Sequence, residues 1–220
     1  MKVELFGESH YIATLPNGEE VYLDRVSHIL AEVGIGPKFG GRAKAAAALG
    51  TEFHEMARAH LSSGWLPVWE DFHEMSDDRR ALLNCWTLFQ EWLSGQDYEV
   101  LDTERKVASL RLAYAGTLDV RLRCRRTNTI GIVDFKTSKP LTSKPSKVAY
   151  KLQLAAYALA LEEMGEELPA WAQVVRVGKE CDTPEVTTAW QDWDQASAAL
   201  YAWEQTVMLA SYVRSAKEAA

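Results

Sequence analysis

The spacing of apolar and polar residues predicts an N-terminal hairpin followed by helices. Strand-like residues alternate through HYIATLPNGEEVYL at residues 10–23, on both sides of Pro16-Asn17-Gly18. Asn-Gly between two such runs is a strong hairpin signal. Apolar residues then recur at helical spacing, with glycines between the runs. The helices predicted from this spacing cover about residues 25–33, 43–63 and 77–95.

The second half of the chain predicts a sheet, with one helix inside it and one after it. The predicted strands run from Glu99 to Ser109, Arg111 to Arg123, Ile130 to Phe135, Trp171 to Val177 and Glu185 to Ala189. The predicted helices cover about residues 147–164 and 192–217. This order indicates an α/β fold: a small mixed central sheet flanked by helices, with an N-terminal hairpin and helical portion. We expect one domain over residues 1–220, with residues 1–95 forming the N-terminal portion and 96–220 the sheet core and last helix.

Composition narrows the class of protein. Apolar residues make up 47% and charged residues 25%, as in ordinary globular proteins. The longest apolar runs are too short to span a bilayer, and the first residues do not have the pattern of a secretory signal, so we expect no membrane partner. The three cysteines are widely separated, without zinc or disulfide spacing. They favour free thiols in the cytoplasm.

Charge is distributed unevenly along the chain. The net charge is −7, yet residues 120–161 hold nine bases and one acid, a net +8, so the remainder carries −15. Because a local field steers a polyanion, this segment favours a DNA partner, although a solvated surface is the alternative. The candidate phosphate contacts are Arg121, Lys139, Lys144, Lys147 and Lys151.

The candidate chemistry centres on Asp134 and Lys136, which end the apolar strand IGIVDFK. Side chains two residues apart on a strand share a face, so the carboxylate and the ammonium point the same way. A carboxylate can hold a divalent cation while the ammonium orients water or stabilises negative charge. A plain ion pair is the alternative.

Asp119 in Gly116-Thr-Leu-Asp119 is a second candidate acid. A tight turn near residues 127–129 predicts antiparallel pairing of the strands on either side, which brings Asp119 within reach of Asp134. Two carboxylates at one sheet end suit magnesium or manganese. Gly116, without a side chain, would let a phosphate backbone approach closely. A surface strand end is the alternative for Asp119.

Two helices add polar candidates. Gln153 and Tyr157 share a helix face at i and i+4, following Lys147 and Lys151 at the same spacing. His54, within the helix predicted at 43–63, offers an imidazole that could bind a transition metal. Packing is the ordinary role of each of these residues.

Taken in order, these residues resemble the RecB-like and phage-exonuclease branch of the PD-(D/E)xK nucleases. The similar segments are Gly50-Thr51-x-x-His54, Gly116-Thr117-Leu118-Asp119, Val133-Asp134-Phe135-Lys136-Thr137 and Gln153-x-x-x-Tyr157. The resemblance covers about residues 25–160 and implies a restriction-endonuclease-like core. The sequence departs from many relatives in having Asp134 in place of Glu, which changes the distance to the metal. It also lacks the cysteine cluster of relatives that carry an iron–sulfur centre.

The resemblance implies a role for each matched residue. His54, Asp119, Asp134 and the Phe135 carbonyl would bind Mg²⁺ or Mn²⁺, and Lys136 would position or activate the attacking water. Gln153 and Tyr157 would support the site or touch the phosphate, and Glu104 in the preceding strand is a further candidate acid. The implied reaction is phosphodiester hydrolysis leaving a 5′-phosphate.

Three functions are compatible with this pattern. The leading hypothesis is a DNA exonuclease of recombination, repair or phage DNA metabolism, with a single-strand annealing or recombination protein as a candidate partner. A structure-selective endonuclease is the second, and only an endonuclease can open closed circular DNA. The third is a noncatalytic DNA-binding module, against which the retention of Asp119, Asp134 and Lys136 argues.

Overall fold

The computed structural model describes residues 1–7, 10–36, 41–137, 144–178 and 180–218, with the side chains of 41–47 and 144–146 left out. Eight strands lie within these residues: β1 (Lys2–Phe6), β2 (His10–Thr14), β3 (Glu20–Arg25), β4 (Tyr98–Ser109), β5 (Tyr114–Cys124), β6 (Ile130–Lys136), β7 (Trp171–Arg176) and β8 (Glu185–Trp190). The same residues form five helices: α1 (Val26–Glu32), α2 (Gly41–Ser63), α3 (Asp77–Ser94), α4 (Lys144–Glu163) and α5 (Trp193–Glu218).

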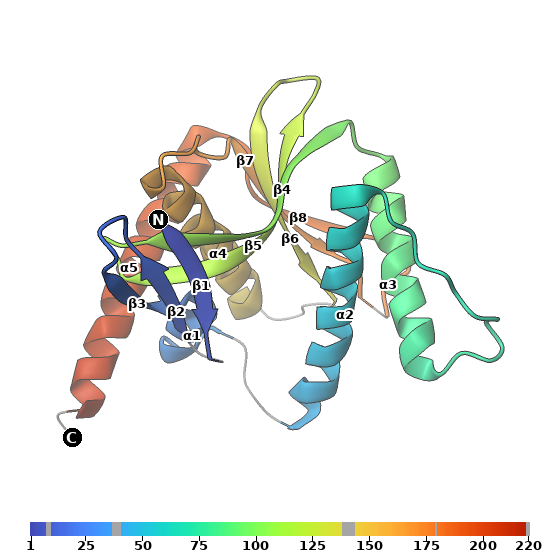
Figure 1. Ribbon diagram of the computed structural model, residues 1–220, viewed down its shortest axis with the longest axis horizontal. Helices are drawn as coiled ribbons and strands as arrows, with labels where there is room; N and C mark the ends of the chain where they lie inside the picture. The colour runs from blue at the N-terminus through green and yellow to red at the C-terminus, as the bar shows by residue number, and fades with distance from the viewer. Residues whose placement is uncertain (8–9, 37–40, 138–143, 179, 219–220) are drawn as a thin grey trace.

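All eight strands belong to one mixed sheet. Its order is β1-β2-β3-β5-β6-β7-β8, and β4 pairs with the other side of β5. The long antiparallel pair of β4 and β5 crosses the molecule and joins the N-terminal strands to the rest of the sheet (Figure 1). β3 pairs with β5 and β6 with β7 in parallel, whereas β5 and β6 are antiparallel, as the tight turn predicted.

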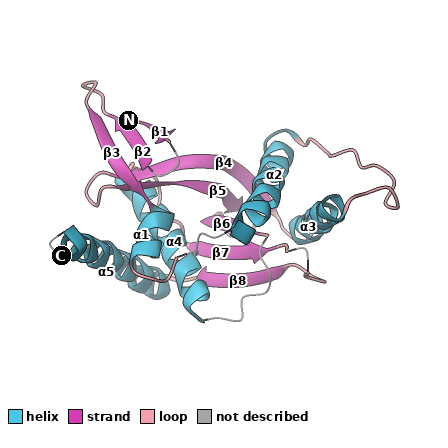
Figure 2. Cartoon of the chain, turned by 90° about the horizontal axis from the view of Figure 1, so that it is seen from below, coloured by secondary structure: helices cyan, strands magenta, loops and turns pink. Residues whose placement is uncertain are grey.

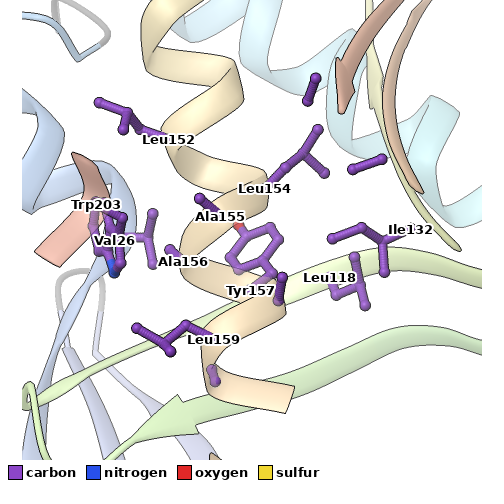
Figure 3. Packing of buried hydrophobic residues seen from close by; sticks show 14 of the residues in the cluster. Val26, Leu118, Ile132, Leu152, Leu154, Ala155, Ala156, Tyr157, Leu159 and Trp203 are labelled. Carbon is purple, nitrogen blue, oxygen red and sulfur yellow. The ribbon is translucent and has the colours of Figure 1, made fainter. Parts of the chain in front are cut away.

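Helices cover the two faces of the sheet as separate groups. Figures 1 and 2 show α2 and α3 together, apart from α1, α4 and α5. α4, whose run of small and apolar residues packs against the sheet, forms one core with α1, α5, Leu118 and Ile132 (Figure 3). α2 and α3 form a second core with Val120, Val133 and Phe135. Alternation along β6 explains this division, because successive residues point to opposite faces.

β5 passes from one core to the other at Asp119. Leu118 belongs to the core under α4, and Val120 belongs to the core under α2 and α3. Strict alternation would put these two side chains on one face, so the strand changes its facing at the residue between them. The candidate acid Asp119 therefore lies at the junction of the two layers.

The sequence predicted most elements within a few residues. The hairpin at residues 10–23 is confirmed as β2 and β3. The pattern missed β1, and the hairpin is continuous with the main sheet through β3. The three cysteines are free, as expected, although Cys124 is only half-buried. None of the helices described here is both long and apolar enough to cross a membrane.

Candidate active site

A gap in the sheet positions the candidate site. On one side of β5, residues 114–115 pair with β3 and residues 120–123 pair with β6. Between them, residues 116–119 have no strand partner on that side in the described pairings. A small pocket of about 200 Å³ lies at this position, and Asp119, Asp134, Lys136, Gln153 and Tyr157 are among its lining residues.

Three carboxylates lie across three neighbouring strands at this gap. The register of β4 with β5 places Glu104 opposite Asp119, between the pairs Thr103–Val120 and Arg105–Leu118. Continuing the β5–β6 register by one residue places Asp134 opposite Asp119, whose Oδ2 accepts a hydrogen bond from the Phe135 backbone N–H at 2.7 Å. Strand pairing therefore brings together acids that are fifteen residues apart along the chain.

Glu104 has an unusual backbone conformation. Its φ is +49°, in the left-handed region that costs a residue with a side chain about 1–2 kcal/mol. The register of β4 also shifts between Val100 and Asp102, just before this residue. Backbone strain of this kind is concentrated at functional sites in proteins, which adds Glu104 to the candidate site on grounds other than sequence pattern.

His54 joins the acids from α2. Its Nδ1 lies 3.4 Å from Asp119 Oδ1 and 3.9 Å from Glu104 Oε1. One potential ligand atom from each of His54, Glu104 and Asp119 lies within 4.8 Å of the other two. Two ligand atoms on opposite sides of a Mg²⁺ ion lie about 4.2 Å apart, so these donors need only small movements to share a cation.

His54 and Asp119 change each other's protonation. Burial alone would raise the pKa of Asp119, but the charge and hydrogen bond of His54, the charge of Lys136 and the Phe135 backbone N–H together outweigh burial, and the pKa is lowered. Burial alone would lower the pKa of His54, but the charge and hydrogen bond of Asp119, with the charge of Asp134, together outweigh that effect, and the pKa is raised. The pair thus favours an ionised carboxylate at the centre of the site.

The pKa values of the two flanking acids, Glu104 and Asp134, are raised, whereas that of Asp119 is lowered. Burial raises the pKa of Glu104 to about 7, with a further contribution from the charge of Asp119. Burial also raises the pKa of Asp134 to about 6, although Lys136 acts against this rise. Crowded carboxylates repel one another in their charged forms, so a divalent cation would relieve this repulsion.

Lys136 is fixed beside Asp134. Its Nζ lies 2.6 Å from Asp134 Oδ2 and 5.0 Å from the centre of the Tyr150 ring, over its face. Burial alone would lower the pKa of Lys136, but the charges of Asp134 and Asp119 and the hydrogen bond to Asp134 together outweigh burial, and the pKa is raised. The lysine therefore stays an ammonium and can donate hydrogen bonds to water or phosphate.

α4 supplies the remaining predicted residues. Gln153 Nε2 donates a hydrogen bond to Tyr157 Oη at 2.7 Å, which confirms that the two share a helix face. Tyr157 extends from α4 toward β5 beside Leu118 (Figure 3). A Cβ on Gly116 would lie 2.5 Å from the Tyr157 ring. Tyr157 thus fills the space that a side chain at position 116 would need. Gly116 also lines the small pocket, so its role in admitting a phosphate stays a prediction.

The donor set suits a hard divalent cation. His54, Glu104 and Asp119 offer one nitrogen and carboxylate oxygens, and Asp134 adds a buried carboxylate nearby. The Oδ2 of Asp134 has its ion pair with Lys136 but no hydrogen bond of ordinary geometry among the described groups. Oxygen-rich sites of this kind bind magnesium and manganese, and an imidazole favours manganese.

Comparison with known proteins agrees with this geometry. A family model described as the PD-(D/E)XK nuclease superfamily matches residues 26–218. The chain belongs to the PD-(D/E)XK nuclease superfamily. No curated protein matches it. Among solved structures it is similar to that titled "Crystal structure of SSO0001", with a TM-score of 0.39 and 15% identity, covering 84% of this chain and 75% of that one. A likeness this distant leaves the assignment resting on the family model.

Membership in the PD-(D/E)XK nuclease superfamily confirms the restriction-endonuclease-like class of the fold, with its mixed sheet between helices. It also supports a metal-dependent nuclease with DNA as substrate. The site of this superfamily member contains two acids and a lysine, Asp119, Asp134 and Lys136, and their assignment to the motif after which the superfamily is named stays a prediction. Membership alone leaves open which branch of the superfamily the chain represents.

The charged segment of this PD-(D/E)XK protein differs from the expectation. Arg121 is only 8% exposed, and its guanidinium is held by Asp102 Oδ2 at 2.6 Å and Glu166 Oε2 at 2.8 Å. We therefore correct its assignment as a phosphate contact, because a buried and doubly paired arginine has no free face. Arg123 and Arg125 also pair with acids, so much of the local positive charge is neutralised.

The other predicted phosphate contacts lie on or before α4. Lys147 and Lys151 are exposed on this helix, and Lys147 lines a pocket of about 190 Å³ with Lys136 and Tyr150. Lys139 and the side chain of Lys144 lie outside the described residues. Contacts of these lysines with DNA remain predictions for this superfamily member.

Proposed function

We propose that this protein is a divalent-metal-dependent deoxyribonuclease acting as an exonuclease in recombination, repair or phage DNA metabolism. The observation that supports it best is the alignment of Glu104, Asp119 and Asp134 across three paired strands, beside Lys136. Carboxylates held this close, partly or wholly buried, carry an electrostatic cost that a structural role does not explain. A metal and a phosphodiester substrate do explain it.

In this proposal His54, Glu104, Asp119 and Asp134, with the Phe135 carbonyl, are the candidate metal ligands. A bound Mg²⁺ or Mn²⁺ ion would supply positive charge to the phosphate and lower the pKa of water. Glu104 extends the set implied by the sequence resemblance, because its oxygen shares the ligand cluster with His54 and Asp119. The imidazole favours Mn²⁺, so we expect manganese to support activity at least as well as magnesium.

Lys136 would act on the attacking water and on the charge that develops at phosphorus. Its ammonium is held by Asp134 and the Tyr150 ring, so little reorganisation is needed during the reaction. Gln153 and Tyr157 would hold the phosphate side of the pocket through the donor groups left after their mutual hydrogen bond. The product strand would carry a 5′-phosphate.

The choice of an exonuclease is supported by the order of motifs, which resembles the phage-type branch. A structure-selective endonuclease is the alternative. The same resemblance supports a single-strand annealing or recombination protein as partner, and the three free cysteines support a cytoplasmic location. Each of these is part of the proposal and is open to test separately from the chemistry.

The test compares wild type with Lys136→Ala on end-labelled linear DNA and closed circular DNA, in Mg²⁺, Mn²⁺ or EDTA. Lys217→Ala is the matched control, because Lys217 is an exposed lysine in the last turn of α5. We expect metal-dependent loss of linear DNA with wild type and control, and at least about 100-fold slower loss with Lys136→Ala. Opening of the circle would favour the endonuclease. Retained binding without cleavage by wild type would favour the noncatalytic module.

A further inference from the structure

A larger cleft lies beside the candidate metal ligands. It has a volume of about 620 Å³, between one face of α2 and the strands β4 and β5. On α2 the lining residues Thr51, His54, Glu55 and Arg58 recur at helical spacing, so a single face of this helix forms the wall. Glu104, Lys106 and Asp119 line the opposite wall.

Two cations, Arg58 and Lys106, line this cleft. Arg58 and Lys106 are exposed, and neither forms an ion pair or side-chain hydrogen bond with another residue in the described part of the chain. Other arginines nearby are engaged: Arg79 pairs with Glu52 at 2.8 Å, and Arg121 is paired twice. Ion pairing therefore accounts for those guanidinium groups but leaves the Arg58 and Lys106 charges available to a ligand.

Arg58 and Lys106 each lie close to a candidate metal ligand along the same helix or strand. Arg58 follows His54 by one helical turn, a rise of about 6 Å along α2. Lys106 follows Glu104 by two residues along β4, a rise of about 7 Å, and is paired with Thr117 in register. The two cations thus approach the same ligands from the two walls of one cleft.

The rest of the cleft is acidic. Glu55, Glu104 and Asp119 all line it, and Glu55 has no place in the metal cluster. A polyanion entering such a cleft meets repulsion that a metal at Glu104 and Asp119 would offset only locally. Favourable entry of a nucleic-acid strand therefore needs cations away from the metal, and Arg58 and Lys106 are the ones that the described walls provide.

We propose that Arg58 and Lys106 form a phosphate-binding subsite for the nucleotide next to the phosphodiester that is cut. The inference rests on the proposed nuclease function and extends it to one side of the site. Arg58 would grip the phosphate through two N–H groups, and Lys106 would act as a point charge. Backbone contacts of this kind fix the register of the strand and carry no sequence preference.

The experiment uses Arg58→Gln, Lys106→Gln and the double variant in the full chain. Lys217→Gln is the matched control, because Lys217 is an exposed lysine in the last turn of α5, outside the basic segment at residues 120–161 and without an ion pair among the described residues. kcat and KM are measured on a linear oligonucleotide in Mn²⁺. Affinity is measured by fluorescence anisotropy over a range of salt in a Lys136→Ala background, where we expect the DNA to stay intact.

Each single variant should raise KM roughly 10-fold, as for removal of a charged hydrogen bond, with kcat changed much less. The slope of log Kd against log salt should fall by about 0.7–0.9 for each phosphate that the variant no longer neutralises. Arg58→Lys should recover the salt slope, because it keeps the charge. The control should match wild type in every measurement.

Two results distinguish failure of the proposed subsite from failure of the proposed nuclease function. Wild-type cleavage with unchanged KM and salt slope in all three variants would overturn the subsite and leave the nuclease intact. An inactive wild type would overturn the proposed function, while a reduced salt slope in the variants would still support a phosphate contact at Arg58 and Lys106. Both cations are exposed, so these substitutions leave the packed cores unchanged.

Discussion

Gly116→Ala tests whether Tyr157 is fixed by close contact with β5. A methyl group at position 116 would lie 2.5 Å from Tyr157 Cε1 and 3.3 Å from Cζ. The Tyr157 side chain cannot swing away freely, because it is 4% exposed between α4 and β5 and forms a hydrogen bond with Gln153. Either the ring or the strand must move by on the order of 1 Å to restore ordinary contact.

Two opposing effects set the magnitude. Replacing a glycine inside a strand by alanine gains about 0.5–1 kcal/mol, since the unfolded chain loses freedom. Overpacking a closely packed site costs about 1–3 kcal/mol. The packing effect is the larger, so we expect a net loss of about 0.5–2 kcal/mol in the free energy of unfolding. For a chain of this size that corresponds to a melting temperature about 1–8 °C lower.

The assay is a double-mutant cycle of urea unfolding with Tyr157→Leu. Leucine lacks the two closest atoms, Cε1 and Cζ, so Gly116→Ala should cost little or stabilise slightly in that background. Gly95→Ala is the control, because a methyl group there would meet nothing nearer than the Trp92 carbonyl oxygen at 3.7 Å. An equal cost of Gly116→Ala in both backgrounds would refute the contact as its cause.

Two further predictions concern charge. Arg121→Ala should lower the free energy of unfolding by about 1–3 kcal/mol in urea titrations, because Asp102 and Glu166 lose one of the two arginines that they share and keep only Arg105. An unchanged urea midpoint, or a lower salt slope of DNA binding, would return Arg121 to the DNA interface. In EDTA, stability should fall as pH rises from about 4.5 to about 7, because Glu104 keeps its proton to about pH 7 when folded and releases it near 4.5 when unfolded. Urea midpoints at pH 5, 6, 7 and 8 measure this fall, and Glu104→Gln should make it smaller. Parallel curves of midpoint against pH for wild type and Glu104→Gln would contradict the assignment.

Local patterns predicted the part of the site that depends on local geometry. Asp134 and Lys136 share a face because side chains alternate along any strand, and they form the ion pair that this geometry allows. Asp119 comes opposite Asp134 because a tight turn fixes the register of two adjacent strands. Gln153 and Tyr157 meet because they are one helical turn apart. None of these inferences requires knowledge of distant contacts.

The remainder depends on contacts between distant segments. Arg121 lies in a basic stretch, yet its acidic partner Glu166 is forty-five residues away along the chain. A count of charges within the stretch therefore does not reveal that Arg121 is paired. Glu104 lies opposite Asp119 through the irregular pairing of β4, which a strand pattern does not reveal. The sequence offers one signal for Glu104 as a site residue, which is its position in the strand that precedes the strand of Asp119. The sequence shows that position 116 has no side chain. It does not show that Tyr157, from another element, occupies the space that a side chain there would need.

The passage of β5 between two cores at Asp119 has a consequence for partial unfolding. Glu104, Asp119 and Asp134 belong to the sheet, whereas His54 is carried by α2, which packs with α3 on one face alone. If that layer detaches as a cooperative unit, the carboxylates stay in place and the imidazole leaves. Metal affinity would then report the opening of one layer, and hydrogen exchange in α2 and α3 should slow when Mn²⁺ is added, ahead of any change in β5 and β6.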